Sequence, residues 1–190
     1  DAHTAQEIVE RTKDRFACAA DDSVLWMWTP LQHAAIAMDV MRLRGFDYKS
    51  QYAWGKDKIG LGYWSREKHE VLLIGVKGKI DCPAPGTQWD SLVMAPRGEH
   101  SAKPECFLEM IEQYFPTLPK IELNRRGPAR KGWASWGNEA VSAGDPSDQH
   151  QTPRANESEN LSENLPAEHL AFIGDLNPDE AGEPVQEAAE

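Results

Sequence analysis

The sequence contains no run of apolar residues long enough to span a bilayer, and we expect no secretory signal at its start. Cysteine is also scarce, since Cys18, Cys82 and Cys106 are the three in the chain and lie far apart. An odd number at such spacing fits neither a disulfide framework nor a zinc site. The sequence therefore predicts a cytoplasmic protein without a metal site, in which the cysteines are small buried side chains.

Basic residues are almost absent from the end of the chain. The formal net charge is −11, yet residues 1–140 carry 19 acidic and 19 basic side chains. The remaining 50 residues carry 12 acidic side chains and one basic one, Arg154. Because the first 140 residues are neutral as a whole, their charge does not exclude a nucleic-acid partner. A tight nucleic-acid binder usually has an excess of basic residues, and these 140 residues have no such excess.

Aromatic residues are missing from the same acidic end, with Phe172 as the exception. Residues 141–190 are rich in Glu, Asn, Ser, Pro and Ala, a composition that buries too little apolar surface to offset the entropy of ordering. We therefore expect a folded domain over residues 1–140 and a disordered acidic tail over residues 141–190. Residues 165–176 could form a weak amphipathic turn or a short helix. A purely solvating role for the tail is favoured over a partner-binding role or competition with nucleic acid.

Helices and strands are predicted to alternate along the first 140 residues. Thr4 and Glu7 have the spacing of a capping box, and a second helix begins at Pro30 and ends at Gly45. The expected helices cover residues 4–15, 30–45 and 104–114, and the expected strands cover residues 24–28, 46–54, 71–76, 91–95 and 120–123. This order favours an α/β fold with a mostly parallel sheet and flanking helices, in which the strand at 120–123 closes the sheet.

Polar side chains follow the last predicted strand. Glu122 lies inside the apolar run 121–123, and buried strands seldom carry a carboxylate without a partner. Arg126, Asn138 and Glu139 come shortly after it. Because open α/β sheets bind ligands at the carboxyl ends of their strands, these four side chains could line a small-molecule pocket. A charged surface loop is an equally good interpretation of the spacing alone.

The segment 55–68 combines glycines with four cations, including Lys56 and Arg66, and two aromatics, including Trp64. Cations can contact phosphate and aromatics can stack on bases, so the segment could bind nucleic acid. Composition alone favours the alternative, an ordinary solvated loop with Trp64 folded onto the core.

Four blocks of sequence carry a more specific signal. The first block is VLWMWTP, which starts at Val24, and the second starts at Gly60 and contains GLGYWSR, HE and LLIGVKG. The third starts at Pro96 and contains PR, EHS and KPE. The fourth starts at Glu122 and contains EL-x-x-R and GW-x-x-WGNE. In this order, over residues 3–140, they resemble the MT-A70-like adenine-N6 methyltransferases. That family includes the mRNA adenosine methyltransferase and phage and bacterial DNA-adenine relatives. The resemblance implies a Rossmann-like methyltransferase fold and methyl transfer from S-adenosylmethionine to an adenine amino group.

The resemblance also implies which residues bind the cofactor. Lys103 would contact the carboxylate or ribose end of S-adenosylmethionine, and Glu122 would shape the pocket at the strand end. Arg126, Asn138 and Glu139 would bond the ribose hydroxyls and neighbouring polar atoms.

Segment 55–68 resembles the substrate-facing loop of the family, so Lys56, Trp64 and Arg66 would contact the nucleic acid. The chain departs from the family at Pro128, where some members have a histidine. Cofactor affinity could therefore be lower, unless Arg130 or Lys131 substitutes.

A larger departure concerns the catalytic Asp-Pro-Pro-Trp of the family, which occurs nowhere in this sequence. The chain is therefore expected to be a piece of an S-adenosylmethionine-dependent methyltransferase acting on DNA, or with less weight on RNA. The alternative is a catalytically inactive subunit that scaffolds an active partner and binds nucleic acid. The enzyme is favoured because the cofactor residues are retained, although no catalytic residue is assigned here. A homodimer or heterodimer is left open.

Overall fold

The computed structural model describes residues 3–60, 64–98, 102–136, 139–141 and 170–175. Its helices are α1 (Ala5–Arg11), α2 (Ala34–Leu43) and α3 (Cys106–Tyr114), with short 3-10 turns at Asp14–Phe16 and Leu31–His33. The strands are β1 (Ser23–Thr29), β2 (Asp47–Gly55), β3 (His69–Lys77), β4 (Leu92–Met94), β5 (Lys120–Leu123), β6 (Arg126–Pro128), β7 (Ala134–Trp136), β8 (Glu139–Val141) and β9 (Leu170–Asp175).

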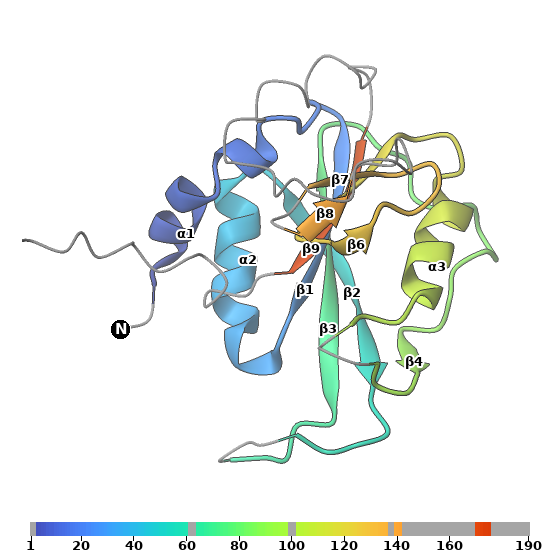
Figure 1. Cartoon of the computed structure of the whole chain (residues 1–190). Helices are drawn as coiled ribbons and strands as arrows, with labels where there is room; N and C mark the ends of the chain where they lie inside the picture. Colours follow the sequence, from blue (N-terminus) through green and yellow to red (C-terminus); the bar gives the residue numbers. More distant parts are fainter. Residues whose placement is uncertain (1–2, 61–63, 99–101, 137–138, 142–169, 176–190) are drawn as a thin grey trace, which may run out of the picture.

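Seven of these strands form one sheet in the order β4-β2-β3-β1-β9-β5-β7, and β6 pairs with β8 separately. Helices α1 and α2 pack on one face of the large sheet, and α3 packs on the other (Figure 1). The predicted α/β class is confirmed. The sheet is mixed rather than purely parallel, because β3 runs antiparallel to both of its neighbours.

Strand β1 supplies side chains to both faces of the sheet. All seven of its residues are buried. Leu25 and Met27 belong to the core beneath α1 and α2, whereas Trp26 and Trp28 belong to the core beneath α3. Alternate residues of a strand point to opposite faces, so a strand covered on both sides is apolar throughout. This explains the continuous apolar run in the sequence.

Strand β3 separates β1 from β2. Because β1 and β2 are both antiparallel to β3, they run parallel to each other and are joined through α2, as a crossover unit requires. The connection from β2 to β3 continues as a ladder beyond the strands, with Lys56 N donating to Lys68 O at 2.8 Å and Gly60 N to Glu67 O at 2.6 Å. A buried apolar run does not reveal strand direction, which is why β3 was not predicted to be antiparallel.

The ends of two helices follow their sequence signals. Thr4 and Glu7 form the predicted capping box of α1, which ends at Arg11 rather than at residue 15. Helix α2 ends where Gly45 adopts φ +82°, with Gly45 N donating to Arg42 O at 2.9 Å and Phe46 N to Met41 O at 3.1 Å. These two bonds make a Schellman motif. Within the described residues, no helix has the length and apolar character needed to cross a membrane.

Two predictions for the end of the chain are wrong. Strand β5 does not close the sheet, because β7 pairs with its outer edge. Residues 170–175, predicted to lie in a disordered tail with at most a weak helix around them, form β9 between β1 and β5. Composition averaged over 50 residues hid the short apolar sequence LAFIG, which starts at residue 170. The rest of the predicted tail, residues 142–169 and 176–190, lies outside the described residues.

The end of α2 gives a stability prediction. The Gly45→Ala substitution should lower the free energy of unfolding by about 1 kcal/mol, because an L side chain is disfavoured in the left-handed region. An added Cβ meets no atom within 4 Å, so backbone strain is the expected cause. Urea unfolding measures the change, and Gly45→Asn is the control, since Asn tolerates this conformation better. Equal stability of the unmodified chain and the two variants would contradict the left-handed conformation assigned to Gly45.

Candidate functional site

Two lysines from different loops meet at one carboxylate beside the carboxyl end of β2. Glu70, in β3, is the register partner of Trp54 in β2. Its Oε1 pairs with Lys56 Nζ, and its Oε2 lies 3.3 Å from Lys103 Nζ. The three side chains are only 16–20% exposed. Two ammonium groups and one carboxylate, here called the Glu70 cluster, thus meet in a half-buried place at this edge of the sheet, where hydrogen bonds between ionised groups are strong.

The two lysines of the Glu70 cluster also lie over buried indole rings. Lys56 Nζ is 4.9 Å from the ring centroid of Trp54, and Lys103 Nζ is 5.9 Å from that of Trp28. Both distances are within the range of cation–π contacts. Trp54 and Trp28 are each 2% exposed. Charged groups at such an apolar surface interact more strongly than charges in open water.

The position of Lys103 depends on bonds that tie its loop to the end of β2. Trp54 Nε1 donates to Ala95 O at 2.8 Å, and Ala95 N donates to Gly55 O at 3.1 Å. Arg97 N donates to Asp57 Oδ1 at 3.1 Å. The start of the segment that follows β4 is therefore held against the base of the β2–β3 connection, on the same side of the molecule as the contact between Lys103 and Glu70.

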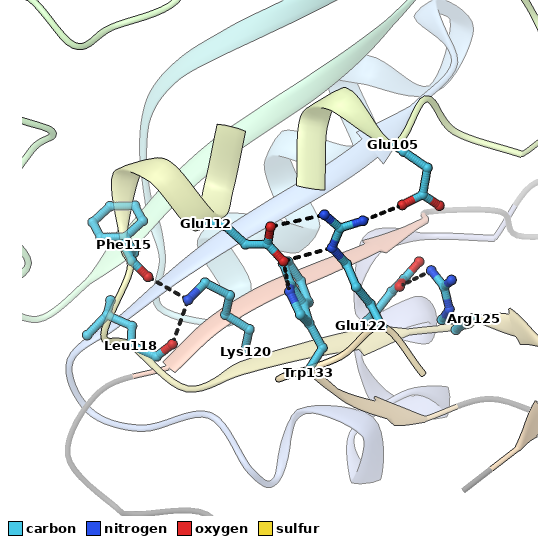
Figure 2. Close-up of polar contacts among 9 residues, drawn as sticks. Glu105, Glu112, Phe115, Leu118, Lys120, Glu122, Arg125 and Trp133 are labelled. Atoms are coloured by element: carbon cyan, nitrogen blue, oxygen red, sulfur yellow. Dashed lines mark hydrogen bonds and ion pairs between the residues drawn. The ribbon is translucent and has the colours of Figure 1, made fainter. Parts of the chain in front are cut away.

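Glu122 lies at the carboxyl end of β5 and has the partner that its burial requires. Arg125 Nη1 donates to Glu122 Oε2 at 2.6 Å, and the two side chains are 18% and 20% exposed (Figure 2). Asn124 between them adopts φ 63°, the left-handed conformation that Asn tolerates in tight turns. This turn brings the arginine back to the strand end. Sequence reasoning missed Arg125, although the i,i+3 spacing across a turn was a usable signal.

The structure brings two of the remaining predicted cofactor residues together. Arg126 in β6 and Glu139 in β8 are register partners, so their backbones lie side by side. Asn138 lies outside the described residues. The paired strands continue from the carboxyl ends of β5 and β7, the sheet edge where the sequence predicted a pocket.

Arg130, one of the two residues that could take the place of the family histidine, binds helix α3. Its Nε and Nη2 donate to Glu112 Oε1 and Oε2 at 2.7 and 3.0 Å, and its Nη1 donates to Glu105 Oε2 at 2.8 Å. Trp133 Nε1 donates to Glu112 Oε1 at 2.7 Å (Figure 2). This network fixes the segment that enters β7. Lys131 is exposed.

Lys120 is a second buried cation with a structural role. It is 5% exposed, and its Nζ donates to Phe115 O at 2.5 Å and to Leu118 O at 2.8 Å (Figure 2). These carbonyls follow the last turn of α3, where a cation is favourable. Burial lowers the pKa of Lys120, and the nearby carboxylate of Glu112 opposes that shift.

The three predicted substrate residues fall into two places. Lys56 belongs to the Glu70 cluster at the base of the β2–β3 connection. Trp64 and Arg66 lie farther out, beyond the bond between Gly60 and Glu67, in the connection that projects from the sheet (Figure 1). Trp64 is fully exposed, so the alternative in which it folds onto the core is wrong.

The fold and these groups define an α/β domain with charged side chains at the carboxyl ends of its strands, where such domains bind ligands. The MT-A70 family model matches residues 16–139. The chain therefore belongs to the MT-A70 family of methyltransferases, as the sequence blocks predicted.

Several curated relatives match about two thirds of the chain. The Type II methyltransferase M.MunI of Mycoplasma sp is 36% identical over 121 residues, which cover 63% of this chain and 52% of the relative. The N(6)-adenosine-methyltransferase subunit METTL3 of Danio rerio is 29% identical over 128 residues, and the catalytic subunit METTL3 of Homo sapiens is 28% identical over 128 residues. Each of these two alignments covers 63% of this chain and 22% of the relative. The chain thus spans about half the length of M.MunI and about a fifth of METTL3.

The Arg130 network gives a pH-dependent prediction. Hydrogen bonding from Arg130 lowers the pKa of Glu112, so the stabilisation is full above the ordinary glutamate pKa and is lost as pH falls through the lowered value. Glu112→Gln should therefore reduce the free energy of unfolding by about 1 kcal/mol at pH 7. Chemical unfolding between pH 7 and pH 3 should show this difference shrinking.

Glu10→Gln is the matched control, because Glu10 pairs with Lys13 at the surface, where both side chains are largely exposed. It should change stability little at any pH. An effect of Glu112→Gln that stays constant down to pH 3 would contradict the role given to its charge.

Proposed function

We propose that the chain carries the cofactor-binding part of an S-adenosylmethionine-dependent adenine-N6 methyltransferase that acts on DNA. The observation that carries this proposal is the pairing of Lys56 and Lys103 with Glu70 beside the carboxyl end of β2. Membership of the MT-A70 family supports methyl transfer. The name of METTL3, an N(6)-adenosine-methyltransferase subunit, supports adenine as the target. The resemblance to bacterial DNA-adenine methyltransferases, together with the higher identity to M.MunI of Mycoplasma sp, favours DNA over RNA.

The residues fit the cofactor by their chemistry. S-adenosylmethionine supplies a methyl group on a sulfonium and carries a carboxylate, an ammonium group and two ribose hydroxyls. The ammonium group of Lys103 in the Glu70 cluster is a donor of the kind that binds a carboxylate. Glu122, half-buried at the end of β5, can accept hydrogen bonds from hydroxyl or ammonium groups. Arg126, Asn138 and Glu139 are assigned to the ribose hydroxyls on the family pattern.

The chain's own residues would act mainly by binding and orientation. Lys103 is fixed by Glu70 and Trp28, and Glu122 is fixed by Arg125, so neither needs to be ordered when a ligand arrives. Preorganised groups at two places along a ligand restrict its motion, and restricted motion places a reacting atom against its target.

Nucleic acid would meet the exposed part of the β2–β3 connection. Trp64 offers an open aromatic face, and Lys58, Arg66 and Lys68 are exposed cations of the same connection. Aromatic stacking and phosphate contacts of this kind do not depend strongly on sequence. We therefore assign this segment to substrate holding and leave sequence specificity to other parts of the protein.

A catalytically inactive subunit is the second candidate function. Such a subunit would bind the cofactor or nucleic acid without transferring the methyl group itself. Transfer of labelled methyl from S-adenosylmethionine to DNA by the purified chain would support the enzyme. The inactive subunit would be supported by two results together. The chain would bind the cofactor or DNA without transferring the methyl group, and a separate active subunit would transfer it faster when this chain is present.

The role of Lys103 is tested by calorimetry with S-adenosylmethionine. Lys103→Met keeps most of the apolar stem but removes the charge, and it should weaken binding about tenfold or more, the loss expected for one charge-assisted hydrogen bond. Lys13→Met is the control, because Lys13 lies just beyond the end of α1 and pairs with Glu10 at the surface. Equal affinity of both variants and the unmodified chain would refute the assignment of Lys103.

The role of Trp64 is tested by fluorescence anisotropy with a labelled single-stranded DNA. Trp64→Ala should weaken binding about tenfold, since stacking of one base on an aromatic side chain contributes roughly 1–3 kcal/mol. Tyr48→Ala is the matched control, because Tyr48 is a 45% exposed aromatic in β2. The proposal for this segment fails if the two substitutions weaken binding equally, or if neither does.

A further inference from the structure

An arginine from the first part of the chain reaches the carboxyl end of β5. Arg15 lies in the 3-10 turn that follows α1, and its Nη1 donates to Asn124 Oδ1 at 3.0 Å. Its guanidinium carbon also lies 4.8 Å from the ring centroid of Trp136, the last residue of β7. Asn124 and Trp136 are themselves joined, because Asn124 N donates to Trp136 O at 2.6 Å. Arg15 therefore holds together the ends of two neighbouring parallel strands.

Asn124 is the residue that turns the chain back toward Glu122. It adopts φ 63°, and the next residue, Arg125, donates to Glu122 Oε2 at 2.6 Å (Figure 2). The left-handed conformation is disfavoured for residues other than glycine, and Asn visits it with the help of hydrogen bonds from its short polar side chain. Here the side-chain oxygen accepts from Arg15. Because arginine has donors and no acceptor, this contact also fixes which end of the Asn124 amide faces it.

A second arginine holds the segment that carries Arg15. Arg44, at the end of α2, donates to Val9 O and Thr12 O at 3.4 and 3.2 Å and also to Thr12 Oγ1. Its guanidinium carbon lies 3.7 Å from the ring centroid of Phe16. The two carbonyls belong to the end of α1, where a cation is favourable. The backbone of Arg15 is therefore held on both sides, at Thr12 and at Phe16.

We propose that Arg15 is a positioning residue of the candidate site, which holds Asn124 so that Glu122 keeps the place in which it can bind the cofactor. Arg15 acts mainly through Asn124 and needs no contact with a ligand. The inference rests on the proposed binding of S-adenosylmethionine at the carboxyl end of β5. It deepens that proposal, because it gives the part of the site with Glu122 a support that comes from the segment between α1 and β1.

The first test measures the affinity of the full chain for two probes by calorimetry. S-adenosylhomocysteine and methylthioadenosine share the adenosine part, and the second lacks the amino-acid end. Arg15→Met should weaken both about tenfold, because side chains that were fixed in advance must then be ordered by the ligand. Arg42→Met is the matched control, since Arg42 pairs with Asp39 at the surface, and it should weaken neither. A loss confined to S-adenosylhomocysteine would overturn the inference, because it would place the effect at the amino-acid end.

A double-mutant cycle separates positioning from a general loss of structure. Glycine adopts the left-handed conformation without strain, so Asn124→Gly removes the bond to Arg15 and keeps the turn. In the Asn124→Gly background, Arg15→Met should change either affinity by less than about twofold, because its partner is already gone. A second loss as large as the first would overturn the inference.

Hydrogen exchange without ligand separates this inference from the proposed function. Arg15→Met should raise the exchange rate of the Asn124 amide, the donor to Trp136 O, at least about tenfold while the β1 amides stay protected. If the unmodified chain binds neither probe, the proposed function is wrong and the inference fails with it. If the chain binds both probes and Arg15→Met changes neither the affinities nor the exchange, the cofactor site stands and the inference about Arg15 alone is wrong.

Discussion

The structure depends on the burial of β1 on both faces and along both edges. Its side chains alternate between the core under α1 and α2 and the core under α3, and its backbone is paired with β3 and β9. A strand in this position leaves no backbone group for solvent, so its neighbours must be hydrogen-bonding strands. The carboxyl end of β1 places the ring of Trp28 under the ammonium group of Lys103. The same strand thus organises both the cores and the candidate site.

Local signals in the sequence predicted much of this fold. The Thr4 capping box and the Gly45 helix end depend on residues within one turn, and both are present. Strand direction and strand order depend on contacts between distant segments, which periodicity does not encode. The antiparallel entry of β3 and the insertion of β9 were therefore missed. β9 was also hidden by its surroundings, because six residues contribute little to the composition of a 50-residue acidic segment.

The sequence predicted several residues of the candidate site, but it did not predict the side chains that pair with them. Lys103, Lys56 and Glu122 lie half-buried at strand ends, as a ligand site requires. The carboxylate that gathers the two lysines, Glu70, and the arginine that holds Glu122, Arg125, were not predicted as site residues. Glu70 acts across a strand pairing, for which the sequence gives no distinctive spacing. Arg125 lies three residues after Glu122, and the left-handed turn at Asn124 that joins them was not predicted. Lys56, predicted to contact the nucleic acid, is paired with Glu70 through the pairing of β2 with β3.

The central claim is that the carboxyl edge of this sheet holds the amino-acid end of an adenosyl cofactor. The most direct measurement is an experimental structure of the chain with S-adenosylhomocysteine. We expect the ligand carboxylate within hydrogen-bond distance of Lys103 Nζ, with the ribose toward Glu122. A ligand bound elsewhere, with no ligand atom beside the two lysines on Glu70, would rule out this cofactor site.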